Sequence, residues 1–157
     1  MLKAESLNKD LESIMQMLNS ITEPCVKAIL LFGSRARGEN EEKSDIDLLV
    51  LHEDCGIHDA VLRRRYLYGL IRRLVGGKFS ITLVDMELND FLRPKNIGSL
   101  LLNIYCDALV LYDSTGLMEK FLETVRNRIS ASGLKRVRSG KAYYWILPEP
   151  LKEVKIL

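Results

Sequence analysis

The chain of 157 residues has few of the residues that staple small proteins together. Its three cysteines, Cys25, Cys55 and Cys106, are an odd number at wide spacing, which indicates neither a disulfide framework nor a Cys-x-x-Cys metal site. A chain of this length buries roughly two-thirds of its unfolded surface and needs no such staple to fold. We therefore expect the cysteines to be reduced.

The sequence also lacks long hydrophobic stretches. No apolar run approaches the ~20 residues that a membrane-spanning helix requires. The N-terminal segment MLKAESLNKDLES is too polar for a signal peptide. These absences predict a soluble, cytoplasmic protein that does not contact a membrane.

Neither sign of charge dominates the chain. The 23 lysines and arginines against 21 aspartates and glutamates leave a net charge of +2, which is too small to indicate a nucleic-acid binder by itself. With 47% hydrophobic and 28% charged residues, the composition is that of an ordinary globular protein and not of a disordered chain. Positive charge is concentrated in residues 134–157, where basic and aromatic side chains are mixed.

The hydrophobic pattern predicts a small domain of the α/β (α+β) class. Helices are predicted over residues 4–21, 57–75, 87–92, 97–107 and 116–131. Strands are predicted over residues 26–32, 45–51, 79–84 and 108–112, with a turn at Ser139-Gly140 that leads into an aromatic strand. We expect a small mixed β-sheet flanked by helices in residues 1–115. A C-terminal helix and tail, residues 116–157, are expected to pack on the same domain.

Two acidic residues lie close together at the start of the second predicted strand. Asp45 and Asp47 are two residues apart, so strand alternation puts both carboxylates on one face, roughly 6–7 Å apart along the chain. Two such carboxylates suit a hard divalent cation, and Mg²⁺ typically binds one or two of them together with phosphate oxygens. The alternative is that both acids are simply solvated at an edge strand.

A glycine and a serine follow the first predicted strand. Gly33 allows a phosphate to approach the backbone closely, and Ser34 at the start of a helical turn offers a hydroxyl and N–H groups to an anion. Arg35 and Arg37 add permanent positive charge. Serine is also a common helix cap, and arginine is common in solvated loops, so this half of the pattern is weak evidence alone.

The two halves together form the pattern Gly-Ser, ten residues, Asp-x-Asp. This pattern resembles the GSx10DxD signature of the polymerase-β-type nucleotidyltransferase superfamily. Within it, the chain is most similar to the minimal nucleotidyltransferases, which include antitoxins that adenylylate HEPN-domain toxins. The segments FGSRARG (32–38) and SDIDLLV (44–50) carry the resemblance, which is specific across residues 26–51.

The resemblance implies a Mg²⁺-dependent enzyme that transfers a nucleoside monophosphate, AMP from ATP above all, to a hydroxyl and releases pyrophosphate. The residues implied to contact the nucleotide are Gly33, Ser34, Arg35, Arg37 and Ser44. Those implied to bind Mg²⁺ and to serve catalysis are Asp45 and Asp47. The implied acceptor is a side-chain hydroxyl on a partner protein such as a HEPN toxin. A small-molecule acceptor, as in the aminoglycoside nucleotidyltransferases, is the alternative, although those relatives usually carry a larger second domain.

The family usually has a third carboxylate, on the strand after the long helix. The best local match is ITLV (81–84), which puts Thr82 where the acid belongs. Strand alternation places Thr82 beside Asp45 and Asp47 and places Asp85 on the core side, unless a bulge brings Asp85 into the catalytic site. A neutral hydroxyl is a weak metal ligand and no base near neutral pH. The alternative function is therefore a catalytically weak or inactive module that binds a nucleotide or a partner.

Two clusters outside this pattern have plain structural interpretations. His52 and His58 are expected in a polar loop, with a metal site as the weaker alternative. The arginines of the second long helix are expected on a solvated face, with an acidic partner or RNA as the alternative (Arg63, Arg64, Arg65, Arg72 and Arg73).

The C-terminal tail has two interpretations. Tyr143, Trp145 and Leu147 are expected to pack on the domain, while the mixture of basic and aromatic residues leaves single-stranded nucleic acid as a weaker alternative. The apolar residues of the last segment, Val154 to Leu157, either dock back on the domain or contact a second copy of the chain.

Overall fold

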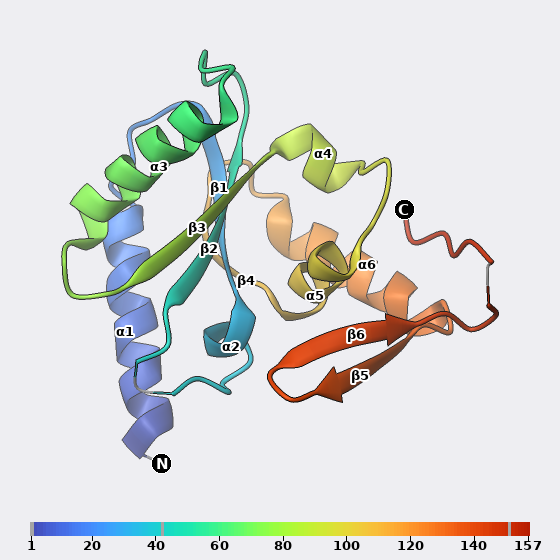
Figure 1. The fold of residues 1–157 in the computed structure, drawn as a ribbon. Helices are drawn as coiled ribbons and strands as arrows, with labels where there is room; N and C mark the ends of the chain where they lie inside the picture. The colour runs from blue at the N-terminus through green and yellow to red at the C-terminus, as the bar shows by residue number, and fades with distance from the viewer. Residues whose placement is uncertain (1, 42, 151) are drawn as a thin grey trace.

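The computed structural model describes residues 2–41, 43–150 and 152–157 (Figure 1). Its helices are α1 (Leu2–Leu18), α2 (Gly33–Ala36), α3 (Ala60–Val75), α4 (Leu88–Leu92), α5 (Ser99–Asp107) and α6 (Met118–Ala131). Its strands are β1 (Val26–Phe32), β2 (Ile46–His52), β3 (Ile81–Glu87), β4 (Leu109–Asp113), β5 (Lys135–Ser139) and β6 (Ala142–Ile146). The predicted order of elements and the mixed α/β class are confirmed.

Four strands form a mixed sheet in the order β3-β2-β1-β4. Strand β1 is antiparallel to both β2 and β4, whereas β2 and β3 are parallel and are joined through α3. A parallel connection needs such a crossover, while an antiparallel pair needs only a loop. The loop between β1 and β2 therefore carries the Gly-Ser and Asp-x-Asp residues to one end of two neighbouring strands.

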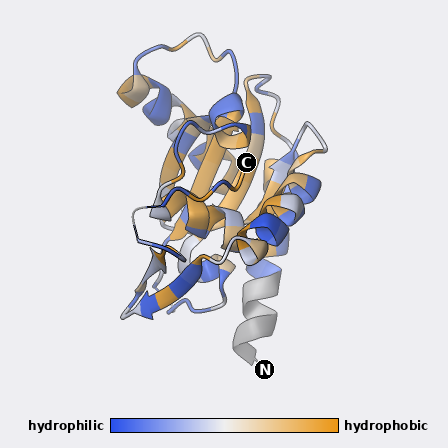
Figure 2. Ribbon diagram, turned by 90° about the vertical axis from the view of Figure 1, so that its right-hand side faces the viewer, coloured by the Kyte–Doolittle hydropathy of each residue, from blue (hydrophilic) through white to orange (hydrophobic). Residues whose placement is uncertain are grey.

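Each face of the sheet is covered by helices, and Figure 2 shows hydrophobic residues concentrated on the strands between them. Alternate residues of β2 face opposite sides. Ile46, Leu48 and Val50 pack with α1 and α3, whereas Leu49 and Leu51 pack with α4, α5 and α6. The acid pair has the parity of Leu49, so it belongs to the face of α5.

Helix α3 begins at Ala60, where the Asp59 side chain accepts a hydrogen bond of 2.9 Å from the Leu62 N–H. The prediction of a helix from residue 57 with Val61 and Leu62 on its buried side is wrong in that respect, since these residues are 69% and 56% exposed. Because Asp59 caps the helix, α3 begins three residues later than predicted. The first turn of α3 lies beyond the edge of the core.

The prediction of reduced cysteines is wrong for two of the three, because Cys25 and Cys55 form a disulfide. Cys25 directly precedes β1 and Cys55 follows β2. Antiparallel pairing places Val26 opposite His52 and brings the two cysteine Cα atoms within 4.9 Å. Residues 30 apart in sequence become neighbours only through this pairing.

The C-terminal segment folds back on the α5 face. Helix α6 buries Met118, Leu122 and Val125 in the same cluster as β1 and β2, and the terminal Ile156 is also buried there. Strands β5 and β6 form an antiparallel hairpin beside α5. Docking back of the chain end is thus confirmed for Ile156. No helix of the described residues is long and apolar enough to cross a membrane.

Candidate active site

The turn after β1 requires glycine for two reasons. Gly33 has φ +74°, in the left-handed region that favours glycine. A Cβ on this residue would also lie 2.2 Å from Oδ2 of Asp47 on the adjacent strand. The absence of a side chain therefore lets the backbone turn pass directly beside the Asp47 carboxylate.

The loop from Ser34 to Ser44 is fastened at both ends. Helix α2 is a single turn, so the approach of an anion there depends on side chains and nearby backbone and gains little from a helix dipole. Arg35 Nε donates a hydrogen bond of 2.9 Å to the Ser44 carbonyl, and Ser44 Oγ accepts one of 2.9 Å from the Glu41 N–H. These contacts bring Arg35 and Ser44 next to the acid pair.

The two acids of the Asp-x-Asp pattern lie at the edge that this loop borders. Asp45 is exposed just before β2, and Asp47 is half-buried in β2, opposite Phe32 of β1 and Thr82 of β3. Burial and the neighbouring Asp45 raise the pKa of Asp47, while Arg37 and Arg35 act in the opposite direction. Two neighbouring carboxylates that repel each other favour a cation between them.

Thr82 occupies the position on β3 beside the acid pair. Its Oγ1 donates a hydrogen bond of 3.2 Å to Oδ2 of Asp45, as strand alternation predicts. The hydroxyl thus completes a row of oxygen atoms across β2 and β3. A neutral hydroxyl adds no negative charge, and it cannot accept a proton at neutral pH.

Asp85 does not join this site. The carboxylate points to the α3 face, where Oδ2 accepts from Arg63 Nε and Oδ1 from Arg64 Nε, both at 2.8 Å. His52 Nε2 lies 3.1 Å from Oδ2. Strands β2 and β3 pair without a bulge, with Asp85 opposite Val50, so the alternative that a register shift brings Asp85 beside Asp47 is wrong.

The same network corrects two further expectations. His52 is not in a polar loop but is the last residue of β2 and is fully buried. Arg63 and Arg64 are not merely solvated, since they hold Asp85. Burial acts to raise the pKa of Asp85, but the hydrogen bonds from the two arginines overcome it and hold the pKa below its usual range. The two oxygens of Asp85 are thus satisfied within this cluster by Arg63, Arg64 and His52 Nε2, whereas the buried His52 Nδ1 has no hydrogen-bond partner among the described residues.

The sequence did not reveal that the C-terminal hairpin reaches the loop of the candidate site. Tyr143 donates a hydrogen bond of 2.5 Å from its hydroxyl to Glu39, and Lys141 forms an ion pair of 2.9 Å with Glu41. Trp145 Nε1 donates to Asn103 of α5 at 2.9 Å. The expectation that Tyr143 and Trp145 pack on the domain is confirmed, whereas Leu147 is 45% exposed. The acidic residues of the loop and the basic residues of the tail were the sequence signal that could have predicted this contact.

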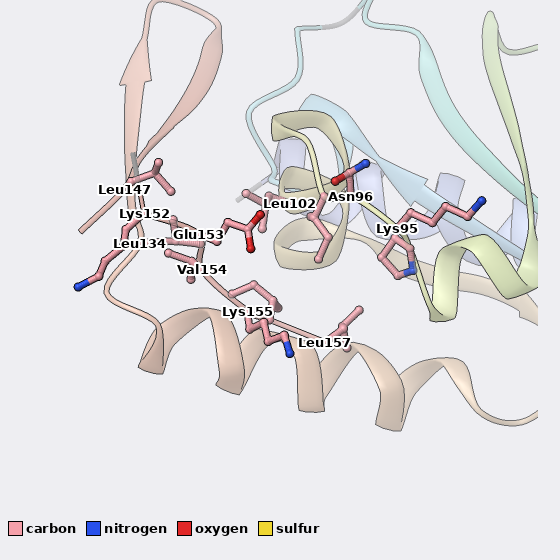
Figure 3. A pocket seen from close by; sticks show the side chains of 13 residues that line it. Lys95, Asn96, Leu102, Leu134, Leu147, Lys152, Glu153, Val154, Lys155 and Leu157 are labelled. Carbon is pink, nitrogen blue, oxygen red and sulfur yellow. The ribbon is translucent and has the colours of Figure 1, made fainter. Parts of the chain in front are cut away.

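A cavity of about 580 Å³ lies elsewhere, between the loop after α4, the base of the hairpin and the C-terminal segment. None of its lining residues belongs to the Gly-Ser or Asp-x-Asp segments. Figure 3 shows the side chains of Lys95 and Lys152 extending away from each other and not toward a common centre. Among the described residues, the lining of this cavity contains one side-chain carboxylate, Glu153, and no pair of them, so the acid pair is the stronger candidate for a cation and phosphate site.

The donor set at the acid pair fits a magnesium ion. Asp45, Asp47 and the Thr82 hydroxyl supply hard oxygen ligands, which Mg²⁺ prefers. Among residues 2–41, 43–150 and 152–157, no group of three or more His, Cys, Asp or Glu side chains could hold a metal ion. The acid pair itself has two such side chains and no third. An ion there would need oxygen atoms from a second molecule, such as phosphates.

Comparison with known proteins agrees with this geometry. Residues 12–114 match the protein family described as polymerase beta, nucleotidyltransferase. A protein of Methanocaldococcus jannaschii, provisionally named a protein adenylyltransferase, is 29% identical over 129 residues, which cover 76% of this chain and 81% of its own.

Two crystal structures also resemble the chain. A provisionally named nucleotidyltransferase from Sulfolobus solfataricus has a TM-score of 0.50 at 21% identity, over 73% of this chain and 89% of its own. A structure described as a toxin-antitoxin with AMP-PNP has a TM-score of 0.46 at 23% identity, over 78% of this chain and 91% of its own. The Sulfolobus structure supports the fold alone.

Proposed function

Since the chain belongs to the polymerase beta nucleotidyltransferase family, we propose that it transfers a nucleoside monophosphate, AMP from ATP, to a hydroxyl of a partner protein. The observation that carries this proposal is the Asp45–Asp47 pair beside the open turn at Gly33. Carboxylates at that place would repel a triphosphate by themselves. A divalent cation that the same carboxylates hold turns the repulsion into a binding site.

The residues around the acid pair have different proposed roles. Gly33 and Ser34 leave room for the triphosphate at the backbone, and Arg35 and Arg37 neutralise its charge. Asp45 and Asp47 would hold Mg²⁺, which supplies Lewis-acid stabilisation of phosphate oxygens when bound. Ser44 orients the loop through its hydrogen bond to the Glu41 N–H.

The reaction forms a bond between the acceptor oxygen and the α-phosphorus and breaks the bond from that phosphorus to the bridging oxygen. Pyrophosphate leaves. Because Thr82 is no base at neutral pH, the hydroxyl proton passes to water. We expect this to make transfer slower than in relatives that have a third carboxylate.

A protein acceptor is supported by the name of the Methanocaldococcus relative, which describes protein adenylylation. A HEPN-type toxin with an acceptor tyrosine is the partner that the sequence resemblance implies. The second candidate function is nucleotide binding without turnover. The position of Thr82 favours it, because its neutral hydroxyl replaces the third carboxylate beside Asp45.

The test incubates the purified chain with Mg²⁺, each of four α-³²P-labelled NTPs and cell lysate as the pool of acceptors. We expect label from ATP on one protein band. The loss variant is Asp45→Asn/Asp47→Asn. The matched control, Glu53→Gln/Asp54→Asn, removes two exposed acids just beyond the other end of β2.

The outcomes separate the two candidates. Label that depends on Asp45 and Asp47 but not on Glu53 and Asp54 supports transfer. Label that persists in the double asparagine variant contradicts the assigned site. Tight binding of Mg²⁺-ATP without label on any protein supports the binding module, and neither binding nor label refutes both.

A further inference from the structure

Arg37 belongs to the loop from Ser34 to Ser44, here called the phosphate loop, and one of its two side-chain anchors lies outside that loop. Its Nη1 donates a hydrogen bond of 3.3 Å to Oδ2 of Asp107, the last residue of α5, and its Nε donates one of 2.8 Å to Glu39. The Arg37 side chain is 16% exposed and that of Asp107 is 11% exposed. An arginine anchored at two nitrogens in a partly buried place has lost most of its rotamer freedom.

Asp107 is in turn fixed by the C-terminal hairpin. Arg136 of β5 binds both carboxylate oxygens in a bidentate pair, at 2.7 Å to Oδ1 and 2.6 Å to Oδ2. This geometry is the strongest that an arginine and a carboxylate form. One carboxylate therefore joins two arginines that are far apart in the sequence, one from the phosphate loop and one from the tail.

The ring of Tyr143 packs against the same pair of arginines. The Cζ atoms of Arg136 and Arg37 lie 4.2 Å and 4.8 Å from its centroid, within the range of cation–π contact. The Tyr143 hydroxyl also binds Glu39, which is the other anchor of Arg37. Figure 1 shows the hairpin lying beside α2 and α5, where these contacts meet.

The anchored guanidinium of Arg37 keeps one nitrogen that could bind a ligand. Arg37 Nη2 makes no hydrogen bond to the residues that the structure describes, whereas Nε and Nη1 are both engaged. The Arg37 N–H also donates a hydrogen bond of 3.3 Å to the Gly33 carbonyl, in the turn that passes directly beside the Asp47 carboxylate. A guanidinium that is anchored on Asp107 and begins next to the turn at Gly33 is a cation set in advance for a phosphate.

We propose that Asp107 is a positioning residue of the nucleotide site, which holds Arg37 against Tyr143 and which the C-terminal hairpin fixes through Arg136. The proposal rests on the proposed function, since it assigns Arg37 to the triphosphate. It links Arg136 and Tyr143 of the hairpin to the nucleotide site, although neither residue belongs to the Gly-Ser or Asp-x-Asp pattern.

The experiment measures binding of a fluorescent ATP analogue in Mg²⁺ to the full chain and to variants Asp107→Asn, Arg37→Ala and their double mutant. Asp107→Asn keeps the shape but removes the charge that orients Arg37. We expect each single variant to weaken binding about tenfold and the double mutant to bind no worse than Arg37→Ala, because Asp107 acts through Arg37. Arg136→Gln should weaken binding in the same way while leaving Asp107 in place.

The control is Lys141→Ala, which breaks another hairpin–loop ion pair that does not touch Arg37. Its binding should be unchanged. Additive losses in the double mutant, or unchanged binding in both Asp107→Asn and Arg136→Gln, overturn the positioning role while the wild type still binds the nucleotide. A wild type that binds no nucleotide refutes the proposed function, and this inference falls with it. Should Asp107→Asn not fold, as judged by thermal unfolding, the same comparison is made with Arg136→Gln in the Arg37→Ala background.

Discussion

The sheet holds two sets of carboxylates that differ in their compensation. Asp85, on the α3 face, has two arginines and a histidine within 3.1 Å and a side chain with no exposed surface. Asp45 and Asp47, on the α5 face, have each other and a neutral hydroxyl. The nearest arginines of the phosphate loop are occupied by other oxygens, Arg35 by a carbonyl and Arg37 by Glu39 and Asp107.

This difference distinguishes a carboxylate that stabilises the fold from carboxylates that can bind a ligand. The donors around buried Asp85 stabilise its ionised form, and they occupy the oxygen atoms that a ligand would need. An acid pair whose neighbouring arginines are bonded to other oxygens costs stability, and a bound cation offsets that cost. Changes at the two places should therefore have opposite consequences.

The largest effect is expected at the acid pair. Asp45→Asn/Asp47→Asn should lower the transfer rate by about 10³-fold, because the site loses its cation ligands. The free energy of unfolding should stay the same or rise, since the repulsion is gone. Transfer assays and urea denaturation measure the two quantities, and a fall in stability that matches the loss of activity would contradict the assignment.

The next largest effect is expected at Asp85. Asp85→Asn should lower the free energy of unfolding by about 3 kcal/mol, because it leaves Arg63 and His52 without their buried anion. Urea denaturation measures the change, with exposed Asp90→Asn as the control. The folded fraction should bind nucleotide as the wild type does, and weakened binding per folded molecule would mean that Asp85 serves the active site.

A glycine pair distinguishes backbone strain from contact with the acid pair. Gly33→Ala should lower the free energy of unfolding by about 2 kcal/mol and also disable transfer, because a Cβ meets the Asp47 carboxylate. Gly38→Ala has a similar φ of +69° but open space around the Cβ. It should cost about 1 kcal/mol and leave transfer intact. Equal transfer in both variants would show that the clearance at Gly33 does not matter.

A third carboxylate at position 82 tests whether the acid pair lacks charge for binding a cation. Thr82→Asp puts a third carboxylate beside Asp45 and should raise affinity for Mg²⁺ about tenfold. Without the metal, its free energy of unfolding should fall, since three like charges meet. Isothermal titration with Mg²⁺ measures the affinity, and Thr124→Asp on α6 controls for net charge. An unchanged affinity would place the metal away from Thr82.

The smallest effect is a difference in pH dependence. The lowered pKa of Asp85 means that its ionised form stabilises the fold above the ordinary aspartate pKa, and this stabilisation is lost as pH falls through the lowered value. The raised pKa of Asp47 means the reverse, because its ionisation costs stability above the raised value and costs nothing below the ordinary one.

Unfolding measured between pH 7 and pH 3 follows both groups. The deficit of Asp85→Asn relative to the wild type should shrink only at acid pH, below the ordinary aspartate pKa. The surplus of Asp47→Asn should begin to shrink at a higher pH. Curves that converge in the same pH range would contradict the contrast.

The part of the site that could be predicted is the part that is local in sequence. Residues 26–51 contain both halves of the pattern, and strand alternation alone places Asp47 and Thr82 on one face. The same alternation could have placed His52 with Asp85 on the α3 face, since His52 shares the parity of Val50. The arginines of α3, the disulfide and the contacts of Tyr143 depend on how distant segments pack, and no periodicity encodes that.

The antiparallel pairing of β1 and β2 has a consequence for folding. Residues 33–45 connect these two strands, whereas the longer segment 53–80 with α3 connects β2 to β3, so closing the first pair carries the smaller entropic cost. We therefore expect the contacts that place the acid pair to form before the buried anion of Asp85 meets its arginines. The acid pair thus depends on the more local contacts of the sheet, whereas the network around Asp85 depends on the longer crossover through α3.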